Sequence, residues 1–99
     1  MSVNRQDTLM LGMKFVNLPE STLEYLDDTD ELDLDGDFMS GTFFVVGKVI
    51  IEGEDEFGFD IQEVPHITDF EQGKVSDLIK YHMNIEEPDV RYYIFTTWG

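Results

Sequence analysis

The 99-residue chain contains no cysteine, and only six of its residues are lysine or arginine. Without cysteine it can form neither a disulfide framework nor a thiolate metal site, and it has no thiol nucleophile. The scarcity of basic residues argues against nucleic acid and anionic membranes as direct partners. The opening segment, MSVNRQDTLMLGMKFV, lacks the apolar run of a signal peptide or a membrane span. We therefore expect a cytoplasmic protein that contacts neither membrane nor nucleic acid directly.

Catalytic motifs are also lacking. His66 and His82 are the only histidines, no serine lies in a nucleophile motif, and neither a G-x-G-x-x-G nor a Walker-type loop occurs. Carboxylates are so abundant that no pair can be singled out as a general acid and base. The sequence therefore predicts a protein that is not an enzyme and that needs no cofactor.

Acidic residues dominate what is present. Twenty-two Asp and Glu give a formal net charge of -16, yet 41% of the residues are hydrophobic and 13% aromatic. That apolar content is too high for a disordered acidic tail. A chain of this length can bury about two thirds of its foldable surface in one core. Residues 1–99 are therefore expected to form a single acidic domain, whose surface attracts basic proteins.

The first half of the chain predicts one strand, one short helix and a charged loop. Apolar residues alternate from Thr8 to Asn17, as in a strand, and Ser21 with Glu24 has the spacing of a capping box for a helix that ends near Asp28. The following segment, residues 27–37, is a charge run for which we predict an ordered, solvated loop.

The second half predicts a hairpin, a longer helix and a last strand. Residues 42–52 and 57–64 are rich in β-branched and aromatic side chains and predict the two hairpin strands. Thr68 and Glu71 have capping-box spacing, and an apolar stripe that includes His82 continues to about Met83. Residues 90–98 predict the final strand.

The resulting order is β-α-β-β-α-β, the split βαβ arrangement of ferredoxin-like domains. It predicts an α+β fold in which a four-stranded antiparallel sheet carries both helices on one face, with the first and third strands at the centre. Too many apolar residues lie in the strands for the other face to be polar. Folding of residues 27–41 over that face, curling of the sheet, a homodimer or a docked partner could each cover it.

Negative charge is concentrated in the first half of the chain. No Lys or Arg occurs between Phe15 and Gly47, whereas nine carboxylates lie between Glu20 and Asp37. If the alternating aspartates from Asp33 onward are extended, their side chains share one side at a spacing of roughly 6.6 Å. Such an array resembles DNA-mimic proteins in composition, because it could occupy Lys and Arg groups that normally bind phosphates.

The same segment resembles the first half of an EF-hand loop, with oxygen-bearing residues around Gly36. The twelfth position, however, is Thr42 where a bidentate Glu is needed, and the next segment predicts a strand instead of a helix. We predict no specific metal site.

The sequence is therefore most consistent with a small acidic inhibitor, of phage or bacterial type, that binds the basic nucleic-acid-binding surface of a nuclease, CRISPR effector, restriction enzyme or regulator. A toxin-immunity protein or antitoxin, which neutralises one cognate nuclease without copying DNA, is the first alternative. A homo-oligomeric binding domain that uses an apolar sheet face is the second. The predicted partner-binding residues are an acidic set, a second acidic patch and three aromatic anchors: Asp27, Asp28, Asp30, Glu31, Asp33, Asp35, Asp37; Glu54, Asp55, Glu56; and Tyr25, Phe38, Trp98.

Overall fold

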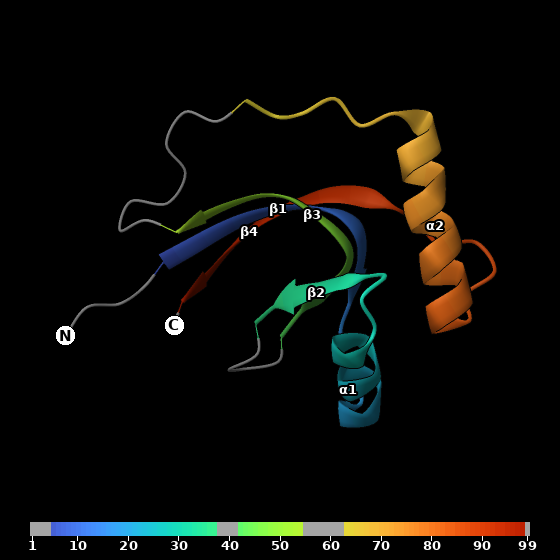
Figure 1. Cartoon of the computed structure of the whole chain (residues 1–99). Coiled ribbons are helices and arrows are strands. Elements are labelled where there is room, and N and C mark those ends of the chain that lie inside the picture. Colours follow the sequence, from blue (N-terminus) through green and yellow to red (C-terminus); the bar gives the residue numbers. More distant parts are fainter. Residues whose placement is uncertain (1–4, 38–41, 55–62, 99) are drawn as a thin grey trace.

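The computed structural model describes residues 5–37, 42–54 and 63–98 of the chain. Its six elements, labelled in Figure 1, are β1 (Arg5–Phe15), α1 (Glu20–Asp28), β2 (Asp33–Gly36), β3 (Phe44–Glu54), α2 (Asp69–Met83) and β4 (Arg91–Trp98). The strands form one antiparallel sheet in the order β2-β3-β1-β4. The predicted β-α-β-β-α-β order and α+β class are confirmed, and the first and third strands are central.

The strand ranges differ from the prediction at two places. A solvated loop was expected over residues 27–37, but Asp33–Gly36 forms β2, so the loop prediction is wrong there. β2 pairs with β3, with Leu34 opposite Val46. The predicted strand at 57–64 lies mostly outside the described residues, and its last two residues, 63 and 64, are not in a strand. The segment predicted as the second strand is therefore β3.

The two helices begin in different ways. α2 follows the prediction: Thr68 is its N-cap, and the Thr68 hydroxyl accepts a hydrogen bond from the Glu71 N–H at 3.2 Å. α1 does not, because it begins at Glu20 with Pro19 as N-cap and no side-chain cap. The Pro19 carbonyl accepts hydrogen bonds from the N–H groups of residues 22 and 23 instead. The capping box predicted from Ser21 is therefore wrong.

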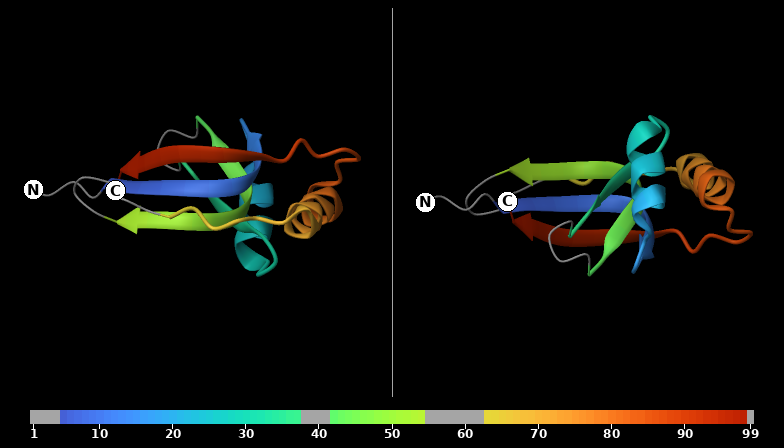
Figure 2. Two further views of the ribbon diagram at one scale, coloured as in Figure 1. Left: turned by 90° about the horizontal axis from the view of Figure 1, so that it is seen from above. Right: turned by 90° about the horizontal axis from the view of Figure 1, so that it is seen from below.

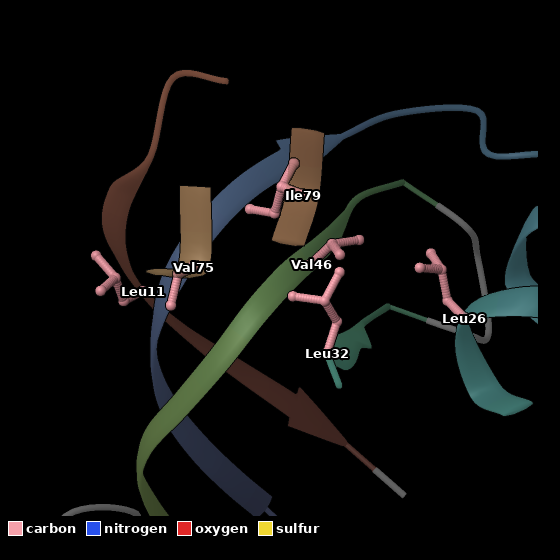
Figure 3. Close-up of a cluster of buried hydrophobic side chains, with 6 residues drawn as sticks. All are labelled: Leu11, Leu26, Leu32, Val46, Val75 and Ile79. Atoms are coloured by element: carbon pink, nitrogen blue, oxygen red, sulfur yellow. The ribbon is translucent and has the colours of Figure 1, made fainter. Parts of the chain in front are cut away.

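The main core lies between the helices and one face of the sheet. β1 and β3 contribute Leu11 and Val46, which project from the same face, and Leu26 of α1 is 1% exposed. Burial of a side chain of this size stabilises the fold by about 1.5–3 kcal/mol. Both helices therefore pack on one face, as predicted. Figure 3 shows the six buried side chains of this cluster, Leu11, Leu26, Leu32, Val46, Val75 and Ile79.

The opposite face of the sheet is also buried, because the sheet is sharply bent (Figure 1). Gly12 and Gly47 are directly paired in β1 and β3, where the two backbones approach too closely for a Cβ atom. The Thr8 hydroxyl lies 3.5 Å from the Asp35 carboxylate, although β3 separates their strands. Met10, in the same layer, is completely buried. Curling of the sheet, one of the expected alternatives, thus covers much of its second face.

Candidate functional site

Five carboxylates from different elements line one cleft of about 320 Å³. They come from the last turn of α1, the loop after it, β2 and β3. The cleft also has apolar walls and one hydroxyl. Its complete lining is Asp27, Asp30, Asp33, Asp35 and Glu52, with Leu26, Leu32, Leu34, Val49 and Thr29. Figure 1 shows α1 next to β2, and these two elements supply half of the lining residues.

The loop between α1 and β2 is fixed at both ends, which holds its carboxylates in place. The Thr29 N–H closes the helix by donating to the Tyr25 carbonyl at 3.2 Å. Leu32 is only 5% exposed and anchors the other end in the core. Asp30, between these anchors, is exposed. The charged group therefore stays at the surface while its neighbours are buried.

The two β2 aspartates have structural hydrogen bonds as well as places in the cleft. Asp33 accepts the N–H of Val49 at 3.0 Å, on the part of β3 that extends past its pairing with β2. Asp35 accepts the N–H of Gly36 at 2.7 Å. Both occupy alternate positions in an extended strand and thus share one side, the arrangement considered in the sequence analysis for an extended segment. These carboxylates therefore stabilise the backbone around the cleft as well as giving the cleft negative charge.

The cleft carboxylates have no basic partners among the residues that the structure describes. The charged contacts found there join Lys48 to Glu71 at 3.5 Å, Arg91 to Asp89 at 2.9 Å and His82 to Glu31 at 3.6 Å, and none of them involves a residue that lines the cleft. Two carboxylates about 6.6 Å apart repel each other by about 0.6 kcal/mol in water and by about 2.5 kcal/mol at an effective dielectric constant of about 20. A bound cation would relieve this repulsion.

Some predicted residues lie near this cleft without lining it. Asp28 is exposed, and Asp37 accepts a hydrogen bond from the Thr42 hydroxyl at 2.8 Å. Tyr25 and Glu31 instead surround His82 of α2: the Tyr25 hydroxyl is 2.8 Å from its Nδ1, and Glu31 Oε1 is 3.6 Å from its Nε2. These contacts tie α1 and the acidic loop to α2.

Other predicted residues cannot be placed. Phe38, Asp55 and Glu56 lie outside the described residues, and the side chains of Glu54 and Trp98 are not described. Sequence reasoning missed the contribution of β3, namely Glu52 and the apolar Val49. Only the pairing of β2 with β3 reveals it, and β2 itself was not predicted as a strand.

Within residues 5–37, 42–54 and 63–98, no group of three or more carboxylate or imidazole side chains is arranged to hold a metal ion. No helix in this part of the chain combines the length and apolar character needed to cross a membrane. Comparison with known proteins finds no match to the chain among protein-family models, curated proteins or solved structures.

Proposed function

We propose that this protein is a small non-enzymatic inhibitor that binds the basic nucleic-acid-binding surface of a partner protein. The observation that supports this most is the cleft, in which five carboxylates converge with no basic side chain paired to them in the described part of the chain. A partner that normally binds phosphates offers the complementary Lys and Arg groups. Blocking those groups would keep nucleic acid away from the partner.

The composition of the cleft fits a long basic side chain. Lys and Arg bury their aliphatic stems on apolar surface and keep the charged group in a polar environment. Leu34 and Val49 provide half-buried apolar walls, and Asp30 and Glu52 are exposed carboxylates at the same cleft. An inserted Arg could form charge-assisted hydrogen bonds with two carboxylate oxygens at once.

Three cleft carboxylates can be altered without disturbing the fold. Asp27, Asp30 and Glu52 are exposed, and within the described residues they make no hydrogen bond or ion pair. Asp33 and Asp35 are unsuitable because they hold backbone N–H groups. The test variant is therefore Asp27→Asn, Asp30→Asn and Glu52→Gln together.

The matched control is Asp77→Asn, Glu86→Gln and Glu87→Gln. All three residues are exposed and lie outside the cleft, and the triple change alters the net charge by the same amount. Each protein is immobilised and used to capture proteins from a bacterial lysate at low and high salt. We expect the wild type and the control to retain nucleic-acid-binding proteins that duplex DNA displaces, and the cleft variant to lose them.

Two results would count against the proposal. Equal capture by the cleft variant and the wild type would show that the cleft is not the binding surface. Retention of a single nuclease that competing DNA does not displace would instead favour the immunity-protein alternative, since such a protein need not occupy the DNA site.

A further inference from the structure

β4 forms an outer edge of the sheet and lacks the features that usually protect such an edge. It is eight residues long, pairs with β1 without interruption from Gly12↔Arg91 to Arg5↔Trp98, and has no strand on its other side among residues 5–37, 42–54 and 63–98. Natural edge strands are commonly shortened, bulged, or interrupted by proline or charge. The segment from Tyr92 to Trp98 contains no charged residue and no proline. Figure 2 shows the three long strands with β1 in the middle, β4 on one side of it and β3 on the other.

The other edge strand is protected, which makes the contrast informative. β2 has only four residues, two of them aspartates, and ends at Gly36, whose φ is +148°. Beyond β2, the N–H of Val49 on β3 is capped by the Asp33 carboxylate. β4 thus carries the long unprotected edge of this sheet.

An exposed apolar side chain marks the middle of the β4 edge. The pairing places Ile51, Leu9 and Ile94 side by side across β3, β1 and β4. Leu9 and Ile51 are partly buried, whereas Ile94, on the outer strand of this row, is 69% exposed. A fifth strand would continue this row and cover Ile94 through cross-strand contacts.

The charge of the region around the β4 edge indicates which kind of segment could pair with it. Residues 5–11 and 92–98 together contain one positive residue, Arg5, and one negative residue, Asp7, so this two-strand region is neutral in a chain of net charge -16. A basic segment would be attracted to the acidic cleft, which is lined by α1, β2 and β3 and not by β4. The neutral β4 edge offers a basic segment no comparable attraction. An extended, uncharged segment therefore fits this edge best, and residues 92–98 of β4 themselves have that chemistry.

We propose that two copies of this protein pair through β4, antiparallel and about a two-fold axis near Ile94, to form one continuous eight-stranded sheet. A two-fold interface places the same surface against itself, and an uncharged strand meets its own copy without like-charge repulsion between their side chains. The acidic cleft of each copy then lies on the outer side of its β3, away from the shared edge. This inference does not depend on what the cleft binds.

Sedimentation velocity of the full-length protein tests the proposal. We expect a concentration-dependent dimer that becomes tighter as NaCl rises from about 0.05 M to about 0.5 M, because salt screens the repulsion between two strongly acidic chains. Ile94→Lys should raise the dimer dissociation constant by about tenfold or more, since a charge within a pairing edge is costly to bury.

Phe70→Lys is the matched control, because it adds the same charge at an α2 position that is 79% exposed. It should leave the dimer unchanged. A second test uses the absence of native cysteine: an Ile94→Cys variant should form a disulfide-linked dimer on air oxidation, and Phe70→Cys should not. This test keeps the proposal falsifiable if Ile94→Lys fails to fold.

A monomer at every concentration and salt would overturn the proposal. So would a dimer that Ile94→Lys leaves intact, a dimer that salt weakens, or a monomer whose β4 edge binds only an extended segment of another protein.

Discussion

Replacing Gly12 by Ala tests whether the close approach of β1 and β3 depends on paired glycines. A Cβ atom at Gly12 would lie 2.1 Å from the Val46 carbonyl oxygen and 2.8 Å from its carbonyl carbon. Both atoms belong to the backbone of β3, so no side-chain rotation can relieve the overlap. The two strands would have to separate at this pair, which would disturb the buried layer that includes Met10.

Overpacking of a well-packed interior costs about 1–3 kcal/mol. Because the neighbours of Gly12 are backbone atoms that cannot move aside, we expect Gly12→Ala to lower the free energy of unfolding by about 3 kcal/mol. Small domains are typically stable by about 5–15 kcal/mol, so the variant should still fold with a clearly lower urea midpoint. Gly73→Ala is the control: Gly73 lies within α2 with no heavy atom within 4 Å of an added Cβ. It should gain about 0.8–1 kcal/mol through helix propensity.

Urea unfolding followed by circular dichroism measures both variants. Gly12→Ala should lower the free energy of unfolding, whereas Gly73→Ala should raise it. If Gly12→Ala matched the wild type in its free energy of unfolding, the close strand approach at Gly12 and Gly47 would be refuted.

Three further changes probe the helices and the charge. Thr68→Ala should lower the free energy of unfolding by about 1 kcal/mol because it removes the cap of α2, whereas Ser21→Ala, which caps nothing, should have little effect; equal losses in urea unfolding would contradict the assigned N-caps. Tyr25→Phe should cost about 1 kcal/mol by removing the 2.8 Å hydrogen bond to His82, and Tyr81→Phe, at a position 78% exposed, should be neutral in the same assay. Raising NaCl from about 0.05 M to about 0.5 M should raise the thermal midpoint, because screening reduces the self-repulsion of a net charge of -16; a fall would contradict this.

The sequence predicted best those elements whose signals are local. α2 has a capping residue at Thr68 and an apolar stripe through Val75 and Ile79 that continues to about Met83, so its start and end could be predicted from the sequence. The long strands β1, β3 and β4 likewise follow from runs of alternating or β-branched residues.

The acidic segment could not be predicted in the same way. β2 has four residues, and its Asp33 and Asp35 form part of a charge run that is typical of a loop. Its strand conformation comes from pairing with β3, which is a long-range contact. The cleft also depends on the pairing of β2 with β3. This pairing brings Glu52 beside carboxylates that lie about twenty residues earlier in the chain. The segment that carries the negative charge could therefore be predicted from the sequence, but the cleft in which its carboxylates lie could not.

The most direct test measures competition between this protein and DNA for a captured partner. Fluorescence anisotropy of labelled duplex DNA bound to that partner is followed while the wild type, the cleft variant of Asp27, Asp30 and Glu52, or the control variant of Asp77, Glu86 and Glu87 is added. Wild type and control should release the DNA at equal concentrations, and the cleft variant should require about tenfold more, since three exposed charge contacts contribute about 0.2–1 kcal/mol each. Release of DNA by the cleft variant at the wild-type concentration would show that the cleft is not the working surface.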